Sequence, residues 1–172
     1  WRRSRMATQA TGTPASLKPP PREGETPWPP PAETRWNDWR ALVPPKLGDW
    51  EPSATVSVVI PAYQAQRELE LVLAVLTEQS YPRSLTQVVV VDDGSSPPIE
   101  LGALADGLEI ELIYRKRHDT RFGAGGARNL GARNAEGEIL VFLDADMVPC
   151  PELIEAHARW HHLASDLATQ GM

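Results

Sequence analysis

The chain has 172 residues and a formal net charge of −6, and its composition is ordinary for a globular protein except for its 17 prolines. That length allows one domain and a long tail. The single cysteine excludes an internal disulfide, and no apolar run is long enough to span a bilayer. No hydrophobic stretch follows the basic opening residues, so they do not form a secretory signal. We therefore expect a cytoplasmic protein, either free or peripheral to the membrane.

Proline, tryptophan and charge all divide the chain near residue 53. Eleven of the 17 prolines and five of the six tryptophans lie before it. Residues 1–52 carry a net charge of +2, whereas residues 53–172 carry −8. We predict a Pro/Trp-rich lead over residues 1–52, largely extended or disordered, whose tryptophans dock on the globular part or on a partner. Because the chain opens on Trp1 and not on Met, we interpret it as an excised piece or a miscalled start.

The acidic globular part, residues 53–172, argues against nucleic acid as a partner, because phosphate binding needs a basic face. Its first predicted strand is the β-branched run at residues 56–60, ended by Pro61. Residues 66–80 predict a helix, because four large apolar residues recur on one face. These are Leu69, Val72, Leu73 and Leu76. A second strand at residues 88–91, a short helix near residues 101–105 and a third strand at residues 109–114 follow.

The rest of the chain continues this alternation. A loop over residues 115–126 precedes a predicted helix at residues 127–135, a fourth strand at residues 139–143 and a last helix from Pro151 to about residue 164. Strands that alternate with helices in this way indicate an α/β fold, a mostly parallel, Rossmann-like sheet with flanking helices. In such sheets ligands bind beyond the carboxyl ends of the strands.

Acidic residues follow two of the predicted strands. Asp92 and Asp93 come after the second, and Asp144 and Asp146 come after the fourth. Carboxylates gathered at one sheet edge repel each other unless a cation balances them, and hard oxygen ligands suit Mg²⁺ or Mn²⁺. Alternate residues of an extended segment point the same way, so the sequence predicts a metal held by Asp144 and Asp146.

Each of these features also has a plainer interpretation. Residues 92–95, Asp-Asp-Gly-Ser, suit an ordinary turn after a strand. The loop at residues 123–126 could bring backbone N–H groups to a phosphate, but it lacks the full dinucleotide fingerprint. Among the basic residues after the third strand we expect mostly solvated charges, with Arg128 the first choice to reach a diphosphate. The histidines near residue 160 have the spacing of a zinc pair but no third ligand, and Cys150 has no partner for nucleophilic chemistry.

Three segments, taken together, resemble family 2 glycosyltransferases, whose fold is of the GT-A type. They are residues 56–63, residues 88–95 and residues 125–146, and they occur in the family's order and spacing. The resemblance implies transfer of a sugar from a nucleotide-sugar donor, usually a UDP-sugar, to an acceptor hydroxyl, usually with inversion. The acceptor is a glycan, a lipid or a small molecule that the sequence does not specify.

The resemblance also implies roles for individual positions. Pro61, Ala62 and Tyr63 would line the nucleoside pocket, and Asp92, together with Asp93, would bind the base. The remaining donor-binding positions are Arg128, Asn129, Asp144, Ala145 and Asp146, with Asp144 and Asp146 also holding Mn²⁺ or Mg²⁺. The general base of the family lies well downstream of the metal motif, so we expect it beyond Met172. On this hypothesis the chain is the donor-binding half, truncated after the Asp-x-Asp motif, and turns over poorly.

Two other functions remain open from the residues alone. Asp144 to Val148 also resembles the nucleophile motif of haloacid-dehalogenase-like phosphatases, in which Asp144 would attack phosphate. Alternatively, the chain is a non-catalytic module that recruits partners through its proline-rich lead. If the chain is instead the truncated glycosyltransferase half, its exposed sheet edge would need a protein partner or the missing C-terminal half.

Overall fold

The computed structural model describes residues 42–102, 107–115, 123–164 and 167–171. Within them four parallel strands form one sheet in the order β3-β2-β1-β4. The strands are β1 (Val56–Ala62), β2 (Thr86–Asp92), β3 (Glu109–Tyr114) and β4 (Ile139–Phe142). The predicted parallel α/β sheet is therefore confirmed, and β3 agrees with its predicted limits. None of the helices in this described part has the length and apolar character needed to cross a membrane.

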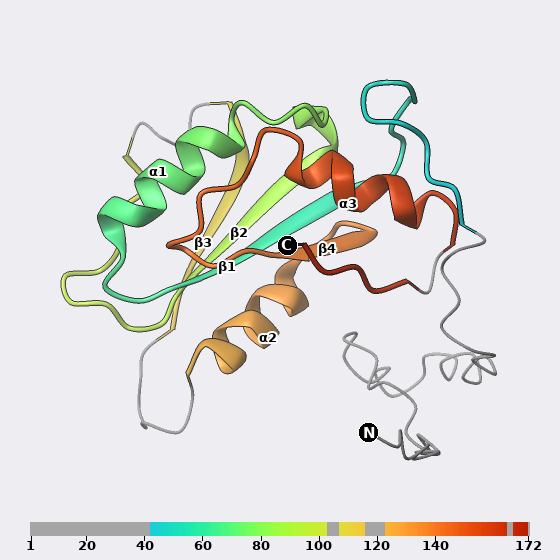
Figure 1. Ribbon diagram of the computed structural model, residues 1–172. Coiled ribbons are helices and arrows are strands. Elements are labelled where there is room, and N and C mark those ends of the chain that lie inside the picture. Colours follow the sequence, from blue (N-terminus) through green and yellow to red (C-terminus); the bar gives the residue numbers. More distant parts are fainter. Residues whose placement is uncertain (1–41, 103–106, 116–122, 165–166, 172) are drawn as a thin grey trace, which may run out of the picture. The chain divides into compact units, whose positions relative to one another are not determined.

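The helices cover both faces of the sheet, as Figure 1 shows. The α-helices are α1 (Gln66–Leu76), α2 (Ala124–Asn134) and α3 (Leu153–His161), and a short 3₁₀ turn, η2 (Arg83–Leu85), precedes β2. On one face, the larger core cluster joins α1 and α3 to side chains of the sheet such as Val58 and Ile60. On the other face, a smaller cluster places Ala127 of α2 against Val59, Val89 and Val91.

Strand β1 is two residues longer than predicted, because Pro61 does not end it. Every second residue along a strand directs its backbone N–H and C=O groups to the same neighbouring strand. The Val59 carbonyl accepts a hydrogen bond from the Leu143 amide on the β4 side, so the backbone of Pro61 faces that side too. The β1–β4 pairing has ended there, so the missing N–H of proline costs no ladder bond.

Helix α1 ends at Leu76, four residues earlier than predicted, because the residues after it form hydrogen bonds with a distant part of the chain. All four of its predicted apolar positions are buried. After them, the Gln79 side chain donates to the Cys150 carbonyl at 2.8 Å and accepts from the Ile154 amide at 3.1 Å. The Ser80 amide donates to the Pro151 carbonyl at 2.9 Å. Residues 79 and 80 thus bind the start of α3 instead of continuing the helix.

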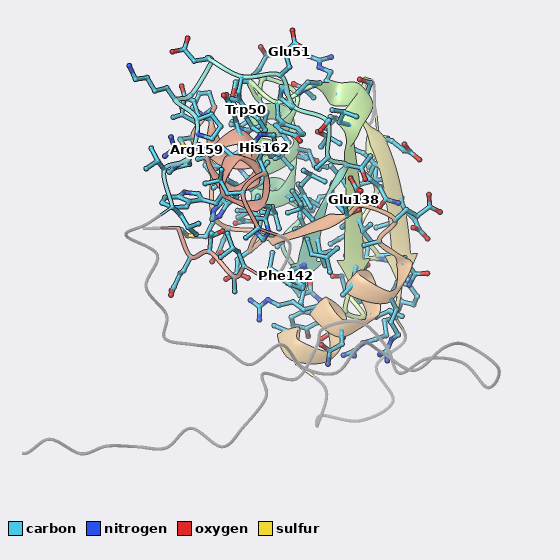
Figure 2. All side chains as sticks on the ribbon, turned by 90° about the vertical axis from the view of Figure 1, so that its right-hand side faces the viewer. Trp50, Glu51, Glu138, Phe142, Arg159 and His162 are labelled. Atoms are coloured by element: carbon cyan, nitrogen blue, oxygen red, sulfur yellow. The ribbon has the colours of Figure 1, made fainter. Side chains whose placement is uncertain are left out.

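Residues 42–52, which we call the arm, contact α3. The Trp50 indole donates to Glu155 at 3.0 Å, and its ring centroid lies 5.5 Å from that of His162 (Figure 2). Glu155 is buried and also accepts from the Gly48 amide at 2.6 Å and the Ser80 hydroxyl at 2.5 Å. Trp50 therefore docks on the globular part, as expected for a tryptophan of the lead. The other four tryptophans of the lead, and most of the predicted helix near residues 101–105, lie outside the described residues.

Candidate functional site

The candidate site lies at the carboxyl ends of the strands, where the sheet changes direction. From β1 the chain proceeds outward to β2 and β3 and then returns to place β4 on the other side of β1. The switch point is therefore between β1 and β4, and a ligand is expected beyond the strand ends there. Tyr63 follows β1 and the Asp144–Asp146 segment follows β4, so both flank the switch point.

Asp92, at the end of β2, holds the backbone of its own turn. It is buried, and its two carboxylate oxygens accept from the Ser95 amide at 2.8 Å and the Ile99 amide at 2.9 Å. Gly94 has φ +82°, a left-handed conformation that favours glycine. The Ser95 hydroxyl in turn accepts from the Gln64 amide at 2.9 Å, which ties this turn to the loop after β1. The turn interpretation of these residues therefore holds for Asp92.

Asp93, the next residue, is paired with one of the basic residues after the third strand, for which the sequence predicts mostly solvated charges. It is buried, and Arg115 donates from Nε to its Oδ1 at 2.7 Å and also forms an ion pair with it. Arg115 directly follows β3, so the rule that directed attention to the ends of the other strands could have found it. Its neighbours Lys116 and Arg117, and Arg121, lie outside the described residues.

Helix α2 carries the second ion pair of the site. Ala127 and Gly131 are buried against the sheet, and Arg128, between them in sequence, forms an ion pair with Asp144. The Arg128 side chain is 35% exposed and that of Asp144 is 52% exposed. Asn129 is exposed and faces away from the Ala127 side, because two residues turn a helix through about 200°. The structure thus brings Arg128, but not Asn129, to the end of β4.

The Asp-x-Asp segment alternates as the sequence predicted. Asp144 and Asp146 are exposed, whereas Ala145 between them is buried in the core cluster. The segment itself is a turn and not the extended segment that the sequence predicts, because the Met147 amide donates to the Asp144 carbonyl at 3.1 Å and Ala145 and Asp146 lie between them. Both carboxylates therefore face solvent. Among the described residues, however, no three His, Cys, Asp or Glu side chains are close enough to hold a metal together. The four carboxylates of β2 and β4 share an edge but do not form one cluster.

Of the three positions predicted to line the nucleoside pocket, one is exposed. Pro61 and Ala62 are buried within β1, and Tyr63 is 50% exposed. The glycines at residues 123–126 are not the loop that was predicted. Gly123 caps α2, and the following three residues form its first turn, in which the Gly126 amide donates to the Gly123 carbonyl at 2.9 Å. A Cβ atom at Gly126 would lie 2.3 Å from a guanidinium nitrogen of Arg115, so Arg115 passes directly over this turn.

The two histidines of α3, His157 and His161, are partly buried. His157 makes a 2.7 Å hydrogen bond with the Thr169 hydroxyl, and burial lowers the pKa of its imidazole. Burial, and then the neighbouring His157, lowers the pKa of His161 in the same way. No third metal-ligating side chain joins them within the described residues, and Cys150 is an exposed free thiol.

Comparison with known proteins agrees with this fold. The family described as glycosyl transferase family 2 matches residues 57–168. Glycosyltransferase AglE of Haloferax volcanii is 35% identical over 105 residues, which are 58% of this chain and 33% of that protein. The amylovoran biosynthesis glycosyltransferase AmsB of Erwinia amylovora is 39% identical over 95 residues, 52% of this chain and 30% of its own. The chain thus spans about a third of the length of these relatives.

Solved structures match the same region. Residues 1–349 of Staphylococcus aureus TarS in complex with UDP match with a TM-score of 0.55 and 25% identity, covering 63% of this chain and 32% of that one. The mannosyltransferase PcManGT of Pyrobaculum calidifontis, in complex with GDP-Man and Mn²⁺, matches with a TM-score of 0.52 and 29% identity, covering 65% and 35%. The family match extends over more than half of the residues of this chain. The chain therefore belongs to glycosyl transferase family 2 and carries part of a GT-A fold.

Proposed function

We propose that this chain carries the nucleotide-sugar site of a glycosyltransferase that uses a UDP-sugar and a divalent cation. The observation that carries the proposal is the arrangement around the switch point, where Tyr63 and the two exposed carboxylates Asp144 and Asp146 flank the same strand ends. Support comes from TarS, whose structure was determined with UDP, and from PcManGT, determined with GDP-Man and Mn²⁺. Family membership favours this function over the phosphatase alternative.

The residues present fit a divalent cation bound together with a diphosphate. Mg²⁺ and Mn²⁺ prefer oxygen ligands, and Mg²⁺ is typically bound by one or two carboxylates, substrate phosphates and water. Asp144 and Asp146 supply two exposed carboxylates, and Asp144 already attracts the cationic side chain of Arg128. The described residues provide no third acidic ligand, which fits a cation that needs the donor diphosphate to complete its shell. When bound, the cation would neutralise charge on the departing diphosphate.

In this proposal different side chains bind different parts of the donor. The exposed Tyr63 ring lies beyond β1 and offers a face for the nucleoside. We assign base recognition to Asp92 together with Asp93 at the end of β2, where the two oxygens of Asp92 also accept the backbone hydrogen bonds of its own turn. Arg115, which pairs with Asp93, orients that carboxylate, and Arg128 reaches toward the diphosphate from α2.

The sugar is transferred when an acceptor hydroxyl displaces the diphosphate at the anomeric carbon, which requires a base to take the hydroxyl proton. Of the two acidic residues that begin α3, Glu155 is unsuited to that role, because its carboxylate is buried and accepts three hydrogen bonds from the arm and from Ser80. Glu152 is the N-cap residue of α3. We propose that the base and the acceptor site are supplied by a partner or by further chain lying beside the outer edge of β4.

Calorimetric titration of UDP into the 172-residue chain, with and without Mn²⁺, tests the proposal. We expect binding that requires Mn²⁺ and is lost in Asp146→Asn, while Asp49→Asn binds like the parent chain. Asp49 is a matched control because it is an exposed aspartate of the arm, and the arm packs on α3 and not at the carboxyl ends of the strands. A folded parent chain that binds no UDP would refute the proposal. Stable modification of Asp144 by beryllium fluoride would instead support the phosphatase alternative.

A further inference from the structure

The ion pair between Arg128 and Asp144 joins the same carboxylate that the proposed function assigns to the divalent cation. Arg128 projects from α2, and Ala127 and Gly131 on either side of it are buried against the sheet. That packing fixes the helix, so it also fixes the origin of the guanidinium group. Asp144 is fixed from the other side, because the neighbouring residues Leu143 and Ala145 are both in the core cluster. The two charges therefore meet because their backbones are held in place, although both side chains reach solvent.

We propose that Arg128 is an exchangeable counter-ion of Asp144, displaced by the divalent cation and then taken up by the donor diphosphate. This inference rests on the proposed function. A guanidinium group and a divalent cation compete for the same carboxylate, since both are attracted by its single negative charge. Once displaced, Arg128 remains anchored beside the cation, where the diphosphate brings new negative charge. A guanidinium fork binds phosphate oxygens with two parallel hydrogen bonds, so it gains a partner in place of the one it lost.

The exchange couples the binding of metal and nucleotide. Without the nucleotide, the cation must displace Arg128 and leave that positive charge close by, which weakens metal binding. With UDP present, the diphosphate neutralises both positive charges, so metal and nucleotide bind cooperatively. Arg115 does not compete for Asp144, because it is paired with the buried Asp93 at the other side of β1.

The first test asks whether the ion pair exists in solution, without any metal. The guanidinium ¹⁵N–¹H signals of Arg128 should show slowed rotation and slowed hydrogen exchange in the 172-residue chain, and both should return to free-arginine behaviour in Asp144→Asn. Unchanged Arg128 signals in a folded Asp144→Asn variant would overturn the proposal. This readout does not depend on UDP or on activity.

The second test measures Mn²⁺ affinity by electron paramagnetic resonance of free Mn²⁺, in the absence and presence of UDP. In Arg128→Gln we expect Mn²⁺ to bind about threefold to tenfold more tightly without UDP, since a nearby positive charge has been removed from a partly screened site. With saturating Mn²⁺, UDP should bind about tenfold more weakly, because a charge-assisted contact to the diphosphate is lost. Arg133→Gln is the matched control, because Arg133 is exposed in the last turn of the same helix and removes the same charge.

The outcomes separate this inference from the proposed function. If the parent chain binds UDP with Mn²⁺ but Arg128→Gln binds Mn²⁺ no better than Arg133→Gln, the exchange is refuted and the donor site stands. If the parent chain shows the ion pair but binds no UDP with Mn²⁺, the proposed function fails, and the exchange fails with it. Tighter Mn²⁺ binding and weaker UDP binding in Arg128→Gln, but not in Arg133→Gln, would support both the exchange and the proposed function.

Discussion

Gly131 allows α2 to pack against the sheet, and replacing it with alanine should loosen that contact. A Cβ atom at Gly131 would lie 2.4 Å from Cγ1 of Val59 and 3.2 Å from Cγ2 of Val91. Carbon atoms in contact prefer about 3.5–4.0 Å, so the helix or the valine must move by roughly 1 Å. Val59 is fully buried and β-branched, and its side chain has little freedom to turn away. The helix itself is therefore the part expected to shift.

The expected loss of stability follows from two opposing terms. Overpacking a buried contact costs about 1–3 kcal/mol, whereas alanine in place of glycine favours a helix by about 1 kcal/mol. Because the 2.4 Å approach to Val59 is far inside van der Waals contact, we take the upper half of the overpacking range, about 2–3 kcal/mol, and expect Gly131→Ala to lower the free energy of unfolding by about 1–2 kcal/mol. Gly125→Ala is the matched control, since its Cβ atom would meet nothing within 4 Å in the first turn of the same helix. That variant should be neutral or slightly more stable.

Urea unfolding followed by far-ultraviolet circular dichroism measures both variants, and a double-mutant cycle identifies the cause. In Val59→Ala the atom that clashes is absent, so Gly131→Ala should cost less in that background than in the parent chain. Equal unfolding free energies for Gly131→Ala, Gly125→Ala and the parent would refute the packing argument. Arg128 is three residues before Gly131, so a shifted helix should also weaken Mn²⁺-dependent UDP binding.

Three further predictions concern single contacts. In Gly126→Ala the new methyl group displaces the flexible end of Arg115, so we expect a small stability change but weaker UDP binding by calorimetry; unchanged affinity would contradict the role of Arg115. Burial opposes ionisation of Glu155, but hydrogen bonds from the arm and Ser80 outweigh it and lower the pKa of that carboxyl. The ionised Glu155 carboxylate therefore stabilises the fold fully above pH 4.5, and this stabilisation is lost as the pH falls below that value. In Glu155→Gln the free energy of unfolding, measured with urea, should depend less on pH in this acid range. Burial, and then the charge of Glu138, raises the pKa of Tyr81 from 10.0 to about 12, so stability should fall as pH rises through that range and fall less in Tyr81→Phe.

Much of the fold could be predicted because the spacing of apolar residues shows whether a helix or strand is buried on one face or on both. The apolar run of β2 is buried throughout, and the four apolar positions of α1 are all buried, as their spacing indicated. The sequence also predicted that Asp144 and Asp146 would share a side, but through an extended segment; both are exposed around the buried Ala145, yet the backbone forms a turn there, closed by the Met147 amide on the Asp144 carbonyl. These features depend on residues close in sequence.

Element ends were less predictable, because they depend on partners distant in sequence. Helix α1 stops where Gln79 and Ser80 bind the start of α3, more than 70 residues away. Strand β1 continues through Pro61 because the neighbouring strand has ended at that level. Neither the loop after α1 nor the proline carries a local signal of those partners.

The sequence by itself determined the order of strands and helices, the acidic residues at the strand ends and the family that they resemble. Only the tertiary structure decided how those charges are paired. It showed that Asp92 serves its own turn, that Asp93 is paired with Arg115, and that Arg128 meets Asp144. The physical reason is that ion pairing depends on a few ångströms between atoms on different elements, and this distance is set by the strand order and by helix packing at Gly131.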